Sequence, residues 1–409
     1  MKFLRTASSR RLLSVIAGLV VAIAAGTAIA VAASGPGPVP PPAPLAQALH
    51  RAAAAPAVHG ITARISFTNR LIDSSDIQGS DPILSGATGR LWLSGDHRLR
   101  LELQSSNGDA QVLVNQGSFW ISDPSSKTVY EGALPSQTAV GKDKARAGQD
   151  KLPSVAQIQS RLNRLMAHVN LSGAIPGDVA GKAAYRVRIS PRHDGGLLGA
   201  AQVAWDAARG VPLRIAVYAT GERSPVLQLE ATDISYGSVP ASVFAIIPPA
   251  GDKVVRVSAP TGHAAGAMSD HAAKATARRH RAEVTGVGAV AHRLSFGLVA
   301  PRTLVGLPRR SVSLLSWGGS PAALISYGQN LGGIAVIEQT PSSASQSQSQ
   351  GMGGDRNGLS LPTVSINRAT GQELDTALGT MLRFTRGGVS YTVLGSVPPA
   401  AADAAARAL

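Results

Sequence analysis

Cysteine is absent from this chain of 409 residues. Its absence excludes disulfide bonds, thiolate metal sites, a cysteine nucleophile and a lipid-modified N-terminal cysteine. It does not place the protein in the cytosol, because an exported protein folds without disulfides when its core suffices. Aromatic residues make up only 4% of the chain. The cores therefore have to be built mainly from Leu, Val, Ile and Ala.

Recognisable catalytic motifs are also absent from the sequence. It contains no Gly-x-Ser-x-Gly elbow, Ser-x-x-Lys pair, His-Glu-x-x-His helix or nucleotide-binding loop. The segment 177–182 has the wrong spacing for a phosphate loop, and Ala183 stands where a magnesium-binding Ser or Thr is needed. His193 and Asp194 are typical of a β-turn, and Asp206 is placed to bond the backbone of its own turn. The sequence predicts no enzyme activity, no catalytic residue and no cofactor.

Histidines at positions 263, 271 and 280 are the best candidates for a metal site. They share a basic stretch rich in Ala and Gly, and histidines in such a linker are typical of a solvated surface. We therefore predict no metal site.

The N-terminus predicts export from the cytosol. Lys2, Arg5, Arg10 and Arg11 precede an uncharged run of 22 residues, Leu12 to Ala33. A helix of that length spans about 33 Å, enough for a bilayer core of roughly 30 Å. Small residues at its end also suit signal peptidase. Residues 1–34 are thus either a cleaved signal peptide or a retained transmembrane anchor.

A formal net charge of +15 limits the classes of binding partner. A basic exported protein suits anionic lipid headgroups or acidic cell-wall polymers. Export argues against nucleic acid, and the chain lacks the aromatic-rich basic strands that such binding uses. We expect an anionic membrane surface as a partner, and no nucleic acid.

Composition divides the rest of the chain into segments. A Pro-rich spacer at residues 35–44 precedes a large domain at 45–257, and a basic linker rich in Ala and Gly follows at 258–291. A smaller α+β domain is expected at 292–409, with a disordered insertion at 342–358. It is expected to end in a helix over Pro398–Leu409, for which Ser396 is the candidate N-cap.

The large domain changes from helical to strand periodicity. We expect a helix at Leu45–Ala55, about ten antiparallel strands beginning at Ile61–Thr68, and one more helix at Ser154–Val169. Strict alternation along Arg98–Gln104 indicates a sheet with one aliphatic and one polar face. The aliphatic residues expected to line a ligand site are Leu91, Leu93, Leu99, Leu101, Leu103, Val112, Val114, Val187, Leu213, Ile215 and Leu229.

The large domain resembles the LolA family of lipoprotein carriers and its LppX/LprG-like and RseB-like relatives. The segment Trp205 to Arg214 resembles the family's Asp-x-x-x-Gly-x-Pro-Leu hairpin, and Val243 to Gly251 resembles its closing segment. The C-terminal segment 381–409 resembles the small domain that follows LolA-like domains in some Gram-positive envelope proteins. The resemblance implies an α+β fold in which an antiparallel, unclosed β-barrel carries helices in its mouth.

Two functions are compatible with these features. The first is an extracytoplasmic carrier that holds acyl chains of a lipid or an acylated protein on the apolar concave face. The alternative is an RseB-like sensor or scaffold that binds a membrane-protein partner. The sequence does not decide the cargo, the oligomeric state or whether the signal is cleaved.

Overall fold

A computed structural model of the chain describes residues 39–72, 82–104, 108–115, 117–124, 127–134, 152–193, 195–247, 250–256, 284–317, 320–341 and 361–409. The chain divides into two compact units. The large unit falls within Lys2–His193 and Gly199–Pro260, and the small unit within Asp194–Leu198 and Thr261–Leu409.

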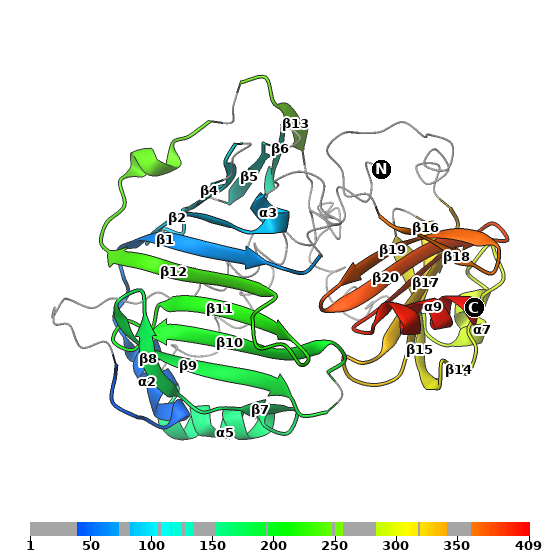
Figure 1. Ribbon diagram of the computed structural model, residues 1–409, viewed down its shortest axis with the longest axis horizontal. Helices are drawn as coiled ribbons and strands as arrows, with labels where there is room; N and C mark the ends of the chain where they lie inside the picture. Colours follow the sequence, from blue (N-terminus) through cyan, green and yellow to red (C-terminus); the bar gives the residue numbers. More distant parts are fainter. Residues whose placement is uncertain are drawn as a thin grey trace, which may run out of the picture. The chain divides into compact units, whose positions relative to one another are not determined.

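The large unit is built mainly from strands (Figure 1). Its elements, in chain order, are α2 Leu45–Ala54, β1 Gly60–Asn69, α3 Pro82–Ser85, β2 Ala87–Ser94, β3 Leu99–Leu103, β4 Ala110–Asn115, β5 Ser118–Asp123, β6 Thr128–Ala133, α5 Val155–Leu165, β7 Val169–Leu171, β8 Ile175–Val179, β9 Lys182–Pro191, β10 Leu198–Asp206, β11 Pro212–Ala219, β12 Leu227–Tyr236, η2 Ala241–Phe244 and β13 Lys253–Arg256.

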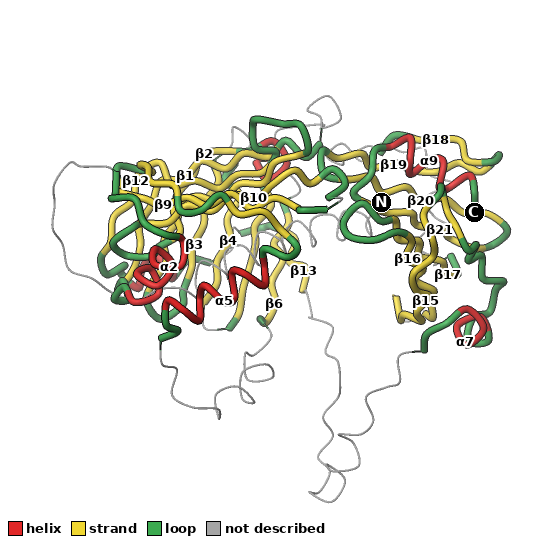
Figure 2. The backbone as a smooth tube through the Cα atoms, turned by 90° about the horizontal axis from the view of Figure 1, so that it is seen from below, coloured by secondary structure: helices red, strands yellow, loops and turns green. Residues whose placement is uncertain are grey.

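All these strands belong to one sheet of 13 strands. Its order is β13-β6-β5-β4-β3-β2-β1-β12-β11-β10-β9-β7, with β8 also paired to β9. The pairings given are antiparallel except for β13, which lies parallel to β6. Among the described strands the two ends of the sheet do not pair with each other, so the curved sheet stays open (Figures 1 and 2). The expected α+β class with an unclosed antiparallel barrel is therefore confirmed.

Strand register brings the aliphatic residues onto one face. Leu91 pairs with Ala63 on one side and with Leu101 on the other, and Leu101 pairs in turn with Val112. Directly opposite residues share a face of a sheet, so each such row continues the apolar surface from strand to strand. Ile65 extends the same surface through its pairing with Ala231 of β12.

The helix α5 is shorter than its apolar periodicity suggested. The expected helix at Ser154–Val169 begins at Val155, with Ser154 and Gln157 forming a capping box, and ends at Leu165. Val169 instead starts β7, where it pairs with Pro191 of β9. The helical spacing of Val169 did not reveal this partner, because the pairing joins residues 22 apart in the chain.

The small unit contains a second sheet, of eight strands. Its elements are α7 Val287–Ala291, β14 Thr303–Leu304, β15 Leu307–Trp317, β16 Ser320–Tyr327, β17 Ile334–Gln339, β18 Thr363–Ile366, β19 Ala369–Thr376, β20 Gly379–Arg386, β21 Val389–Gly395 and α9 Pro399–Arg407. The strand order is β14-β15-β16-β17-β21-β20-β19-β18. Alanines of α9 and Val290 of α7 pack with one core on this sheet.

Two expectations for the small unit need correction. The linker expected at 258–291 ends earlier, because α7 packs against β15 and Thr285 forms a bridge with Ser313. Ser396 is not the N-cap of the last helix, which begins after Pro398. Its hydroxyl instead donates a hydrogen bond to the carbonyl oxygen of Leu378 at 2.8 Å.

Several expected segments lie outside the described residues. They are the signal or anchor at 1–34, residues 258–283 of the linker, and the insertion at 342–358. Within the part of the chain that the structure describes, no helix is long and apolar enough to cross a membrane.

Glu338 is an unusual residue in the core of the small unit. Its side chain is fully buried on β17, and its Oε2 accepts a hydrogen bond from the amide of Val299 at 3.0 Å. Its Oε1 has no hydrogen-bond partner among the described atoms. Burial raises the pKa of the Glu338 carboxyl to about 7, and the Val299 amide opposes this shift only in part.

We predict that the small unit loses stability as the pH rises from about 4.5 to about 7. In that window the folded carboxyl keeps its proton while the unfolded one has released it, so the folded state binds more protons. The free energy of unfolding then falls with pH by about 3 kcal/mol in all. Scanning calorimetry across the window measures this slope. Glu338→Gln cannot ionise and is expected to flatten it; an unchanged slope in this variant would contradict the assignment.

Candidate functional site

The residues expected to line the site fall mainly into one apolar cluster of the large unit. Six of them are buried members of it: Leu91, Leu93, Leu99, Leu101, Leu103 and Leu213. Three more are half-buried and pack against it: Val112, Val114 and Leu229. The expected face is thus assembled across β2, β3, β4, β11 and β12.

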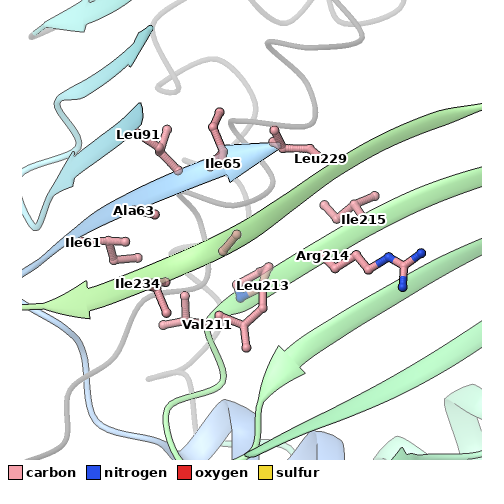
Figure 3. A pocket seen from close by; sticks show the side chains of 12 residues that line it. Ile61, Ala63, Ile65, Leu91, Val211, Leu213, Arg214, Ile215, Leu229 and Ile234 are labelled. Carbon is pink, nitrogen blue, oxygen red and sulfur yellow. The ribbon is translucent and has the colours of Figure 1, made fainter. Parts of the chain in front are cut away.

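A small cavity lies at the centre of this face, over β1, β12 and β11 (Figure 3). Leu91, Leu213, Ile215 and Leu229 all line it, although Ile215 is not a member of the apolar cluster. Arg214 is the one charged residue of its lining, and its guanidinium reaches the opposite face of the sheet, where it donates to Gln228. The volume of the cavity is about 30 Å³, which is room for about two or three water molecules.

Seven other apolar residues of the lining were not among the expected set: Ile61, Ala63, Ile65, Val211, Pro212, Ala231 and Ile234. The first three alternate along β1, so the two-residue period of that strand could have revealed them. Alternation along β12 does not place Ala231 and Ile234 on the same face, because they are three residues apart. A register shift in the β1–β12 ladder falls between Arg64 and Ile65, and it returns Ile234 to the face that Ala231 occupies.

Val187 lies in a separate cluster, beneath a helix. It packs with Tyr185 and Trp205 against Ala48 of α2. The rings of Tyr185 and Trp205 are 6.0 Å apart between centroids. At β9 and β10 the apolar face is therefore covered by α2, and Val187 does not border the cavity at the centre of the sheet.

The turn between β10 and β11 closes one end of the apolar face. Oδ1 of Asp206 accepts hydrogen bonds from the amides of Ala208 and Arg209 at 2.8 and 3.0 Å. Gly210 adopts a φ of 67°, and a Cβ there would lie 2.4 Å from the carbonyl oxygen of Ala52 in α2. The expected role of Asp206 in bonding the backbone of its own turn is confirmed.

Asp206 also has a long-range partner that the sequence did not indicate. The hydroxyl of Tyr236 donates to its Oδ2 at 2.7 Å, which ties the turn to the end of β12. Burial, followed by this hydrogen bond and the charge of Asp206, raises the pKa of Tyr236. The Arg209 guanidinium and the Lys182 ammonium lie 4.3 and 5.9 Å from the Tyr236 ring centroid. These are cation–π distances.

The opposite face of the sheet is polar. Arg214 donates to Oε1 of Gln228 at 2.7 Å, and Gln228 donates to Glu230 at 2.6 Å. The guanidinium of Arg188 lies 4.4 Å from the ring centroid of Tyr218. The two faces therefore differ in kind, as the alternating pattern indicates: one is linked by hydrogen bonds and the other is almost wholly aliphatic.

The described residues include no group of three or more His, Asp or Glu side chains that could hold a metal ion. What the arrangement offers chemically is an aliphatic surface that can exclude water, with polar groups confined to its ends and its far side. Such a surface suits an apolar ligand and needs no specific polar contact.

Comparison with known proteins shows only distant likenesses. No family model matches the sequence, and no curated protein matches it. The structure is similar to MucB in complex with MucA(peri), with 15% identity over 88% of this chain and 97% of that chain and a TM-score of 0.40. It is also similar to the Pseudomonas aeruginosa MucA/MucB complex, with 15% identity over 88% of this chain and 94% of that chain and a TM-score of 0.38. A LolA superfamily protein of Nitrosomonas europaea is similar with 10% identity over 50% of this chain and 99% of that chain and a TM-score of 0.21. Likenesses of this size do not assign the chain to a family.

We predict that Asp206→Ala destabilises the large unit by about 3 kcal/mol, because the two turn amides and the Tyr236 hydroxyl all lose their acceptor. Tyr236→Phe removes one of these hydrogen bonds and keeps the ring, so it is expected to cost about 1 kcal/mol. Urea unfolding followed by circular dichroism gives both values. A stable Asp206→Ala variant that fails to bind ligand would instead give Asp206 a direct role in binding.

Proposed function

We propose that the large unit binds the acyl chain of a lipid or of an acylated protein on its apolar face. The observation that carries this proposal is the continuity of that face. Aliphatic side chains from β1, β2, β3, β4, β11 and β12 pack into one cluster. A face of this kind is what an acyl chain requires, since such a chain offers no polar atoms along its length.

Burial of an acyl chain supplies a large favourable energy. Burial of one methylene group contributes about 0.8 kcal/mol, so a chain of about 16 carbons contributes roughly 12 kcal/mol before the costs of association and ordering. Contacts with the aliphatic side chains would therefore supply the main favourable energy, and a specific polar contact is not required. The absence of a sequence motif for this site follows from the same physics.

The cavity has to widen before a chain can enter. A space of about 30 Å³ accommodates only a small part of an acyl chain, so the lining side chains must move apart on binding. The ligand then selects an open state of the face over the closed one. Uptake is expected to be slow compared with diffusion, because this rearrangement precedes or accompanies it.

The first test uses residues 35–409 and a fluorescent fatty acid whose emission rises in an apolar environment. We expect saturable uptake by the unchanged chain and a loss of at least about tenfold in affinity for Ile215→Gln, which places an amide in the lining of the cavity. Ile215 is half-buried, so its replacement is expected to spare the fold.

Ile247→Gln is the matched control. It makes the same chemical change in the large unit at a side chain that is 86% exposed and absent from the cavity lining. Equal affinities for the two variants would show that the ligand does not bind at the cavity. No uptake by the unchanged chain, together with a protein adduct in membrane crosslinking that is lost on deletion of residues 292–409, would favour the alternative sensor or scaffold.

A further inference from the structure

The helices α2 and α5 pack together on the large unit, and the described segments that contain them carry no acidic residue. They pack against each other and lie side by side in both views (Figures 1 and 2). The described segments 39–72 and 152–177, which contain them, have no Asp or Glu. Arg51 of α2 and Arg161 and Arg164 of α5 are all exposed. We call these two helices and their flanking residues the helix-pair surface.

A further arginine adjoins the end of α5. The amide of Arg192 donates to the carbonyl oxygen of His168 at 3.1 Å, just beyond the last turn of the helix. The side chain of Arg192 is exposed. The positive charge of the helix-pair surface thus comes from separate parts of the chain that the fold brings together.

Exposed apolar side chains also occur in α5 and in the residues that precede the two helices. Among the described residues, nine large apolar side chains are exposed, and four of them are Val39, Leu152, Val155 and Leu165, at 61, 43, 39 and 44%. Val155 and Leu165 share one face of α5 with Ile158, which is buried. The centre of this apolar face therefore packs on the protein, while both of its ends reach solvent.

We propose that the helix-pair surface docks on an anionic lipid bilayer. Its arginines would contact lipid phosphate groups, and its exposed Val and Leu side chains would enter the boundary between headgroups and acyl chains. The charge has the right sign, since the whole chain carries +15 and anionic surfaces attract clustered arginines.

This docking is independent of acyl binding in the central cavity, because none of its residues lines that cavity. Each basic residue near an anionic surface strengthens binding about fivefold. Replacement of two arginines should therefore reduce the ratio of docked to undocked protein by about 30-fold. Added salt should weaken the docking in the same direction.

The test uses the full chain and single-cysteine labelling, which the natural absence of cysteine makes unambiguous. Val155→Cys and Leu165→Cys carry an environment-sensitive fluorophore on α5. Val305→Cys is the matched control, because Val305 is also a partly exposed valine, at 41%, but belongs to the small unit. Each labelled chain is mixed with phosphatidylcholine vesicles, with and without phosphatidylglycerol.

We expect the α5 probes to shift to shorter emission wavelengths only with the anionic vesicles, and the control probe to keep its emission. Arg161→Gln with Arg164→Gln should remove the shift, whereas Arg302→Gln with Arg310→Gln makes the same change of charge in the small unit and should leave it. Equal emission at all three positions would overturn the proposal. So would an equal loss with the two arginine pairs, because the effect would then follow net charge alone.

Discussion

The large unit depends on one constraint, the need to keep the aliphatic side of a one-sided sheet away from water. Strand after strand presents Leu, Val, Ile or Ala to that side, and the register of the ladders aligns these rows from β4 to β11. Where α2 lies on β9 and β10, the face is covered by a helix. At the centre of the face, side chains from neighbouring strands pack around a space of about 30 Å³. The proposed ligand would replace contacts that these side chains now make with one another.

The end of this face is fixed by the hydrogen bonds of one buried carboxylate. Asp206 holds the β10–β11 turn through two amides and joins it to β12 through Tyr236. Gly210 lets the same turn approach the backbone of α2, where a side chain would collide with Ala52. A short sequence motif thus positions three elements at once. This explains why its residues serve the fold while the ligand surface lies elsewhere, on side chains that carry no motif.

The sequence predicted the period-two pattern well, because alternation depends only on neighbouring residues. Leu99, Leu101 and Leu103 were assigned to the correct face from Arg98–Gln104 alone, and the turn at Asp206 was assigned from residue type. What failed depends on partners distant in the chain. The register shift opposite Ile65 places Ile234 on the apolar face, and the parallel pairing of β13 with β6 joins residues 125 apart. The hydrogen bond from Tyr236 to Asp206 and the pairing of Val169 in β7 were missed for the same reason, because both join residues distant in the chain. The two arginine-bearing helices were each foreseen, but their packing side by side was not.

The central claim is that the apolar face is occupied by acyl chains in the cell. Extraction of the purified protein with organic solvent, followed by mass spectrometry of the extract, tests it most directly. The account predicts acyl lipid in an amount comparable to that of the protein, and much less from Ile215→Gln than from Ile247→Gln. An extract without lipid, from protein that also takes up no fatty acid, would contradict it.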